Sequence, residues 1–167
     1  VTGGTGYIGS HTVVELQNEG FEPIIIDNLS NSSISVLEGI EKITGKRPVF
    51  EQIDCKDIND MDLLFTKHKD IVAIIHFAAS KAVGESVIKP LMYYRNNLKS
   101  MLNIMELMIK HNVENLVFSS SCTIYGQPDI LPVTEKAEIK PALSPYGNTK
   151  QICEEIINDT AHANPHI

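Results

Sequence analysis

A tyrosine and a lysine four residues apart give the strongest indication of chemistry in this sequence. Tyr146 and Lys150 fall one turn apart on the same face of any helix that contains them. An ammonium group beside a phenol stabilises the phenolate, so we expect Tyr146 to act as a base. The same spacing also occurs on solvent-facing helices, and the pair therefore needs support from other residues.

A run of three serines supplies the first support. Ser119 to Ser121 follow the apolar segment 116–118, which predicts a strand with hydroxyl groups at its carboxyl end. We expect Ser121 to hydrogen-bond the same substrate hydroxyl as Tyr146. Removing hydride from the carbon of an alcohol requires removal of the hydroxyl proton as well. A base and a hydroxyl together therefore fit oxidation of an alcohol by a hydride acceptor.

The first nine residues indicate what that acceptor is. Two overlapping spacings, Gly4-x-Gly6-x-x-Gly9 and Gly3-x-x-Gly6-x-x-Gly9, lie between the end of an apolar strand and the start of a helix. In dinucleotide-binding folds, backbone N–H groups and a helix N-terminus at this place face a pyrophosphate. Glycine lets the backbone approach the ligand without a Cβ. Glycine triplets also occur in ordinary loops, so the signal depends on its context.

Asp27 provides part of that context. It ends the apolar run 23–26 and lies eighteen positions after Gly9, near the ~20 expected for a carboxylate that binds the adenosine ribose. A helix cap or turn carboxylate is the alternative. A carboxylate there repels a 2′-phosphate, so we expect NAD rather than NADP. Asp54 and Cys55 end the next strand and are candidates for contact with adenine, although a buried structural cysteine is the alternative for Cys55.

Apolar runs and helical stripes alternate along the chain. After a first strand that ends at Val1, we expect strands at 23–27, 49–53, 71–77 and 116–121. We expect helices at 7–19 closed by Gly20, at 34–43 closed by Gly45, from 58 with Asp57 as N-cap, from Pro90, and from the cap pair Ser144-Pro145. Five strands alternating with five helices predict an α/β fold with a doubly wound parallel sheet of the Rossmann type.

Three further segments of the sequence carry expectations. His76, inside a strand, is expected to be a core histidine, and the aperiodic loop 127–144 is long enough to be functional. The helix from Pro90 is expected to bury one apolar stripe, and its further apolar residues need a second partner such as another subunit. The stripe consists of Leu91, Tyr94, Leu98, Met101, Leu102, Met105 and Met108.

Length and composition limit the possible functions. With 167 residues, one domain is expected. It would be a Rossmann domain over 1–167, lacking most of its first strand and the sixth strand, with no C-terminal substrate domain in this chain. A net charge of −7 argues against nucleic-acid binding. Cys55, Cys122 and Cys153 form no metal or disulfide pattern, and no apolar run is long enough for a membrane span, so we expect a cytoplasmic protein without a metal ion.

Four segments carry a family resemblance. They are residues 2–12, 77–86, 119–126 and 145–150, and together they resemble the UDP-glucose 4-epimerase family of the extended short-chain dehydrogenase/reductase superfamily. The glycine loop is shared across the superfamily. Residues 81–86 and the serine run are specific to these epimerases and their nearest relatives, and the resemblance spans the whole chain.

The resemblance implies roles for individual residues. Tyr146 matches the catalytic base, Lys150 its partner on the nicotinamide ribose, and Ser121 the hydroxyl that helps to deprotonate the sugar, while Lys81 joins Ser121 and Tyr146 at the substrate. Of Asn96 and Asn97, either is expected to face the site. The implied NAD-binding residues are Gly3, Gly6, Tyr7, Ile8, Gly9, Asp27, Asn28, Asp54, Cys55, Phe77, Ala78, Ala79, Lys81, Asn96, Asn97, Ser119, Tyr146 and Lys150.

The resemblance also implies a reaction and an assembly. The reaction is reversible oxidation at C4 of UDP-glucose or UDP-galactose, as in galactose metabolism, through a 4-keto sugar and with NAD kept as a resident cofactor. The assembly is a homodimer formed through the helices at 91–109 and 146–160. Because the domain that binds uridine diphosphate would follow Ile167, the 167-residue chain alone is expected to be inactive.

Two other functions stay open. A nucleotide-sugar 4,6-dehydratase or decarboxylase uses the same fold and the same Tyr-Lys pair. Dehydratases place an Asp-Glu pair just after the serine-ended strand, where this chain has Cys122-Thr123, which argues against dehydration and less strongly against decarboxylation. A non-catalytic dinucleotide-binding module is the second alternative, although it has no need for Ser121, Tyr146 and Lys150 together.

Overall fold

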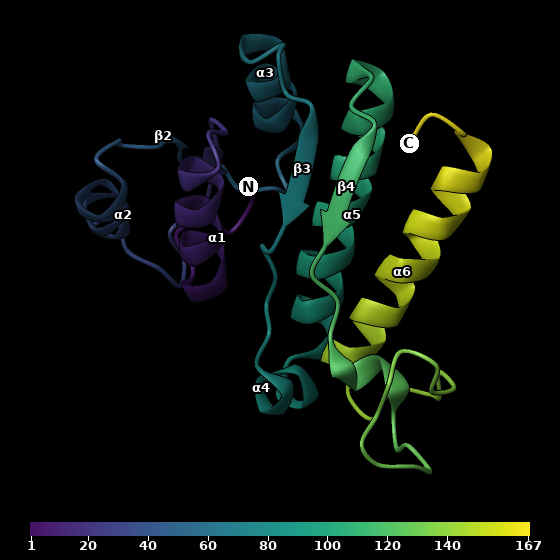
Figure 1. The fold of residues 1–167 in the computed structure, drawn as a ribbon. Coiled ribbons are helices and arrows are strands. Elements are labelled where there is room, and N and C mark those ends of the chain that lie inside the picture. The colour runs from purple at the N-terminus through teal and green to yellow at the C-terminus, as the bar shows by residue number, and fades with distance from the viewer. The chain divides into compact units, whose positions relative to one another are not determined.

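The computed structural model describes residues 1–167 and divides into two compact units (Figure 1). Unit 1 consists of residues 1–78, 106–119 and Ile167. Unit 2 consists of residues 79–105 and 120–166. The glycine loop and Asp27 therefore belong to unit 1, whereas Ser121, Tyr146 and Lys150 belong to unit 2.

A parallel sheet is the centre of unit 1. Strand β1 (Ile24–Ile26) pairs with β2 (Val49–Glu51), and β3 (Ala73–His76) pairs with β4 (Asn115–Phe118), both in parallel. Figure 1 shows the arrows of β3 and β4 side by side. Thr2 bridges to both Ile26 and His76, which gives the order β2, β1, Thr2, β3, β4.

This order confirms the predicted fold class. In the doubly wound Rossmann sheet, the strand that precedes the glycine loop lies at the centre, with later strands added on either side of it. Thr2 occupies that central place here, so the first predicted strand is present only as an isolated bridge. The four later strands are confirmed and are each shorter than predicted.

The helices of unit 1 begin and end largely where local signals predict. They are α1 (Tyr7–Asn18), α2 (Val36–Thr44), α3 (Ile58–Lys67) and the last turns of α5 (Pro90–His111). Gly20 and Gly45 adopt φ values of 86° and 74° just beyond α1 and α2, as a C-terminal glycine does. Asp57 caps α3 by accepting hydrogen bonds from the N–H groups of Asn59 and Asp60. These boundaries confirm the caps expected from the sequence.

One face of α2 differs from the prediction. Leu37 and Ile40 are buried against Val13, Val14 and Ile25 of α1 and β1. Ile34 and Ile43 were also expected on this face, but Ile34 precedes the helix and Ile43 is 67% exposed. Because the helix starts at Val36, the face of Leu37 and Ile40 continues at Thr44, whose hydroxyl donates to the Gln17 side chain of α1 at 2.9 Å.

Unit 2 is mainly helical. It contains α4 (Val83–Ile88), residues 90–105 of α5, the 3₁₀-helix η1 (Cys122–Tyr125) and α6 (Pro145–Ala163). The Ser144 hydroxyl accepts a hydrogen bond from the Gly147 N–H at 3.1 Å, which confirms the predicted cap of α6. Residues 127–144 contain no helix or strand, as predicted. The two short helices, α4 and η1, were not predicted. None of the helices is long and apolar enough to cross a membrane.

The buried face of α5 is partly polar, and its prediction was partly wrong. Leu91 and Leu102 were expected in the core but are 66% and 45% exposed. Tyr93, Asn97 and Ser100 are buried instead. Their polar atoms have hydrogen-bond partners, which removes much of the cost of burial. Met101, Met105 and Met108 of the predicted stripe are buried, as expected. The buried face also includes Asn97 and Ser100, which a pattern of apolar side chains alone leaves out.

Candidate functional site

The glycine loop of unit 1 is closed on itself. The Gly6 N–H donates to the Gly3 carbonyl at 3.0 Å. A Cβ on Gly9 would collide with that same carbonyl oxygen, and a Cβ on Gly3 would lie 2.7 Å from the Ala78 nitrogen. Gly3 also has a φ of 68°, which side-chain-bearing residues rarely adopt. Only glycine fits at these two positions without a shift of the backbone.

The loop leads into a helix start that no side chain caps. Gly6 is the N-cap residue of α1 and has no side chain to bond the first turn. The first N–H groups of a helix lack partners within the helix and attract anions. The predicted residues Gly6, Tyr7, Ile8 and Gly9 thus lie together at one helix N-terminus. This arrangement fits the pyrophosphate of a dinucleotide.

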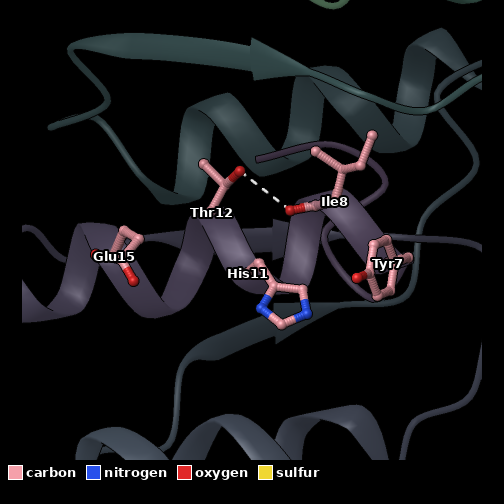
Figure 2. Close-up of a pocket in the computed structure, with 5 residues that line it drawn as sticks. All are labelled: Tyr7, Ile8, His11, Thr12 and Glu15. Atoms are coloured by element: carbon pink, nitrogen blue, oxygen red, sulfur yellow. Dashed lines mark hydrogen bonds between the residues drawn. The ribbon is translucent and has the colours of Figure 1, made fainter.

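The outer surface of α1 is a separate feature. Figure 2 shows a hollow lined by Tyr7, Ile8, His11, Thr12 and Glu15, which all belong to this one helix. The Tyr7 and His11 rings meet edge to face at 5.0 Å. No polar group from another element lines the hollow. We therefore place the candidate site at the loop and at the start of α1, and assign no ligand to the hollow.

Asp27 lies beside the glycine loop. Its Oδ2 accepts a hydrogen bond from the Thr5 N–H at 3.2 Å, and its Oδ1 accepts from the Leu29 N–H at 2.9 Å and the Ser32 hydroxyl at 3.0 Å. The hydroxyls of Ser32 and Thr5 also meet at 2.8 Å. The carboxylate is therefore fixed against the loop that precedes it by 22 residues. Sequence reasoning missed Thr5 and Ser32. The available signal was a hydroxyl residue within the glycine loop and another five residues after Asp27.

The next strand end also gathers predicted residues. Asn28 donates to the Asp54 carboxylate at 3.0 Å, and Lys56 lies 3.4 Å from it. Burial raises the pKa of Asp54, but hydrogen bonds from the Lys56 N–H and the Asn28 amide, together with the Lys56 charge, outweigh burial and hold this pKa below its ordinary value. Burial raises the pKa of the Cys55 thiol to about 12. Cys55 is therefore a buried neutral thiol, which fits a structural role, and its contact with adenine stays a prediction.

The end of β3 is tied to the start of the glycine loop. The Thr2 hydroxyl lies 2.6 Å from His76 Nδ1 and accepts from the Ala78 N–H at 3.3 Å. His76 is buried and its ring stacks on Phe118 of β4, which confirms the expectation of a core histidine. Through Thr2, the predicted residues Phe77 and Ala78 lie beside Gly3. Ser119, which follows β4, donates its N–H to the His76 carbonyl at 3.2 Å.

In unit 2, both candidate asparagines bind Ser80. The Asn97 amide accepts from the Ser80 N–H at 2.9 Å and donates to the Ser80 carbonyl at 3.0 Å. Asn96 donates to the Ser80 hydroxyl at 3.1 Å. Asn97 is buried, whereas Asn96 is half-buried. The two residues thus hold the segment that carries Ala79 and Lys81, and Lys81 itself is exposed.

A buried tyrosine holds the other end of this segment. The Tyr93 hydroxyl accepts from the Ala82 N–H at 3.0 Å and donates to the Glu85 carboxylate at 3.0 Å. Burial and the hydrogen bond to Glu85 raise the pKa of Tyr93. Sequence reasoning missed Tyr93, because its partners depend on the path of the chain between β3 and α5.

The predicted Tyr-Lys pair lies in the first turns of α6. The Lys150 ammonium is 5.9 Å from the centroid of the Tyr146 ring. Tyr146 is half-buried, and Lys150 is only 4% exposed. Burial lowers the pKa of Lys150 to about 8. A buried cation beside a phenol can stabilise the phenolate more strongly than a solvated one, because the local dielectric constant is lower.

Ser121 is held close to the same helix by η1. Its hydroxyl accepts from the Thr123 N–H at 3.3 Å and from the Thr123 hydroxyl at 3.0 Å. Thr123 in turn packs on the first turn of α6, where a Cβ on Gly147 would lie 3.2 Å from both the Cβ and the carbonyl oxygen of Thr123. Unit 2 therefore brings Ser121, Tyr146 and Lys150 into one region, with no group of His, Cys, Asp or Glu side chains arranged to bind a metal ion.

Comparison with known proteins gives a consistent picture. UDP-glucose 4-epimerase from Haemophilus influenzae is 50% identical over 165 residues, which cover 99% of this chain and 48% of that protein. The Bacillus subtilis enzyme of the same name is 50% identical over 159 residues, or 95% of this chain and 46% of that protein. The chain thus spans about half the length of the curated relatives that it matches.

Solved structures agree with these relatives. UDP-glucose 4-epimerase from Bifidobacterium longum, in complex with NAD+ and UDP, superimposes with a TM-score of 0.95 and is 46% identical, over 98% of this chain and 49% of that one. The enzyme from Stenotrophomonas maltophila, with bound NAD and formylated UDP-arabinopyranose, gives a TM-score of 0.92 at 46% identity, over 97% of this chain and 48% of that one. The model of the NAD dependent epimerase/dehydratase family matches residues 1–166, and the chain belongs to this family.

Proposed function

We propose that this chain is the NAD-binding and catalytic part of a UDP-glucose 4-epimerase. The observation that carries the proposal is the Tyr146–Lys150 pair of α6 in one unit with Ser121. The relatives named above, at up to 50% identity, carry the name UDP-glucose 4-epimerase, which supports the same reaction. We propose UDP-glucose and UDP-galactose as its two substrates. We propose a role in galactose metabolism on this basis.

NAD is the proposed cofactor, and the residues of unit 1 fit it. The uncapped start of α1 at Gly6, in the loop that Gly3 and Gly9 close, suits a pyrophosphate, and the carboxylate of Asp27 beside the loop suits a ribose diol. The remaining residues proposed to contact NAD are Asn28, Asp54, Cys55, Phe77, Ala78, Ala79, Lys81, Asn96, Asn97, Ser119, Tyr146 and Lys150. When bound, NAD supplies a reversible hydride acceptor for C4 of the sugar.

The side chains of unit 2 move and hold the proton. Tyr146 takes the proton of the 4′-hydroxyl as C4 is oxidised to a ketone, and returns it when C4 is reduced from the other face. Ser121 hydrogen-bonds the same hydroxyl and fixes its direction. Lys150 stabilises the phenolate of Tyr146 from a buried position. Lys81, exposed on the same unit, is proposed to contact the substrate.

A dehydratase or a decarboxylase is less well supported. Dehydration requires an acid and a base for loss of the C6 hydroxyl and a C5 proton. The two residues after Ser121 are Cys122, which is exposed, and Thr123, whose hydroxyl is bonded to Ser121. Neither is an acid. A chain that only binds a dinucleotide has no use for the arrangement of Ser121, Tyr146 and Lys150.

The proposal extends to assembly and location. Leu91, Leu102 and Ile109 of α5 are exposed, and we propose that the helices at 91–109 and 146–160 form a homodimer interface. Cys55, Cys122 and Cys153 form no disulfide, which supports a cytoplasmic location. The chain covers about half the length of each relative. We propose that the domain that binds uridine diphosphate lies in the other half, and we expect the 167-residue chain alone to be inactive.

Substitution of Tyr146 tests the function. In a protein that carries this chain and extends to the length of the relatives, which we call the full-length protein, UDP-glucose should be converted to UDP-galactose. Tyr146→Phe should lower turnover by about 100- to 10,000-fold, because the proton acceptor is lost. Thr66→Val, which deletes an exposed hydroxyl on α3 with only a local bond to the Asp62 carbonyl, is the control and should keep turnover. Unchanged turnover in Tyr146→Phe, or a 4-keto-6-deoxy product without UDP-galactose, would refute the proposal.

A further inference from the structure

Thr149 is a fully buried hydroxyl between the two residues of the Tyr-Lys pair. Its side chain is 0% exposed, and its hydroxyl donates to the Tyr146 carbonyl at 2.7 Å. The same oxygen accepts a hydrogen bond from the Asn97 amide of α5 at 3.0 Å. Both the donor and an acceptor capacity of this hydroxyl are therefore used within unit 2.

The bond to Asn97 links α6 to the segment that precedes α4. Asn97 has two amide hydrogens, of which one goes to the Ser80 carbonyl and the other to Thr149. Its Oδ1 accepts the Ser80 N–H at 2.9 Å. A continuous path of hydrogen bonds thus runs from the backbone of Ser80 through Asn97 and Thr149 to the backbone of Tyr146.

A second threonine on α6 shows what is particular about Thr149. The Thr160 hydroxyl donates to the Ile156 carbonyl at 2.6 Å, which is a common local bond for threonine in a helix. No side chain of another element bonds Thr160, and it is only half-buried. The local bond to the preceding turn is therefore ordinary, whereas burial and the Asn97 amide are specific to Thr149.

We propose that Thr149 is a positioning residue that holds the turn of Tyr146 and Lys150 in register with the Ser80–Lys81 segment. Its effect on turnover rests on the proposed function. Thr149→Val keeps the branched shape but leaves one Asn97 hydrogen without an acceptor in a buried place, so the Asn97 amide is free to shift. A small displacement of a catalytic group can cost a large factor in rate.

The experiment compares three variants of the full-length protein. Thr149→Val should lower kcat by about 10- to 100-fold with KM for UDP-glucose changed by less than about threefold, because positioning and not binding is lost. Thr149→Ser keeps the hydroxyl and should stay within about threefold of the unsubstituted protein in kcat. Thr160→Val is the matched control and should leave both constants unchanged. Hydrogen exchange of the Ser80 amide should be faster in Thr149→Val only.

The possible results separate a positioning role of Thr149 from a purely structural one. A lower melting temperature for Thr149→Val with unchanged kcat assigns Thr149 a structural role only and overturns the inference. Equal loss in Thr149→Ser and Thr149→Val overturns it as well, since the hydroxyl would not matter. If the unsubstituted full-length protein has no epimerase activity, the proposed function fails, and the Ser80 exchange rate still decides whether Thr149 holds the two segments. If Thr149→Val does not fold, Thr149→Ala takes its place in both measurements.

Discussion

The Lys150 ammonium lies 5.9 Å from the centroid of the Tyr146 ring, at a position that is only 4% exposed. Burial lowers the pKa of Lys150 from 10.5 to about 8. The folded state therefore pays a free-energy cost to keep this side chain charged. The cation that is proposed to stabilise the phenolate is in this way a source of instability in the fold.

Replacing Lys150 by methionine should make this cost measurable. The pKa in the folded state is below that of the unfolded state, so the unfolded state binds more protons between pH 8 and pH 10.5, and the stability of the unsubstituted protein rises with pH in this window. Lys150→Met lacks this rise. The stability of the variant relative to the unsubstituted protein should fall by about 3 kcal/mol from pH 8 to pH 10.5, as measured by urea unfolding.

The control for this experiment is Lys42→Met at an exposed position of α2. This variant should show the same dependence of stability on pH as the unsubstituted protein. Parallel curves for Lys150→Met and the unsubstituted protein between pH 8 and pH 10.5 would show that burial does not perturb Lys150.

The glycine loop gives a prediction with an internal control. In Gly9→Ala the new methyl group meets the Gly3 carbonyl oxygen, whereas in Gly39→Ala, on the exposed side of α2, it meets nothing within 4 Å. Gly9→Ala should lower the free energy of unfolding by about 1–3 kcal/mol, as overpacking does, and should prevent retention of NAD. Gly39→Ala should raise it by about 0.5–1 kcal/mol, since glycine is unfavourable inside a helix.

Urea unfolding and the NAD content of the purified full-length protein check both variants. Retention of NAD by Gly9→Ala at the unsubstituted level would mean that the closed loop is not the cofactor cradle. If the two substitutions changed the free energy of unfolding equally, the close contact between residue 9 and the Gly3 carbonyl would not be what destabilises Gly9→Ala.

Much of the fold could be predicted because its signals are local. Ser144 caps α6, Asp57 caps α3, and Gly20 and Gly45 end α1 and α2, all within a few residues of the helix that each one bounds. The face of α2 was misplaced at Ile34 because the helix starts two residues later. Amphipathic periodicity cannot locate the first residue of a helix when apolar residues with the same spacing lie before it.

The candidate site was predictable only where a spacing carries the chemistry. Tyr146 and Lys150 lie on one helix, so the sequence distance sets their separation. Asn97 bonds Thr149 across 52 positions, and Asp27 is fixed by Thr5 across 22. Hydrogen bonds of this kind depend on the tertiary path of the chain, and a single sequence gives no signal of which polar residues are paired.

Tyr93 illustrates such a long-range contact and is open to a direct test. Tyr93→Phe removes from a fully buried side chain the hydroxyl that accepts from the Ala82 N–H and donates to Glu85. We expect a loss of about 0.5–1.5 kcal/mol in the free energy of unfolding, together with faster hydrogen exchange at residues 80–86. Greater mobility of the segment that carries Lys81 should also weaken binding of NAD to the full-length protein.

Tyr94→Phe is the matched control for this position. Tyr94 also accepts one hydrogen bond, from Asn148 at 2.8 Å, but it is half-buried, so water can replace the lost partner. Its exchange rates at residues 80–86 should equal those of the unsubstituted protein. If both variants loosen this segment equally, the Tyr93 hydroxyl does not hold it.

Asp27 offers a test of cofactor choice. In Asp27→Asn one carboxylate oxygen becomes an amide, so the Thr5 N–H or the pair of donors on the other oxygen, Leu29 N–H and Ser32 hydroxyl, faces a donor instead of an acceptor. Loss of a charged acceptor should weaken NAD binding by about 10-fold or more. The affinity for NADP should rise relative to the affinity for NAD, because the negative charge that repels a 2′-phosphate is gone. Asp57→Asn is the control, since asparagine caps a helix as well as aspartate, and it should leave both affinities unchanged. Titration of each nucleotide into the full-length protein measures the ratio, and an unchanged preference for NAD in Asp27→Asn would remove Asp27 from the proposed ribose site.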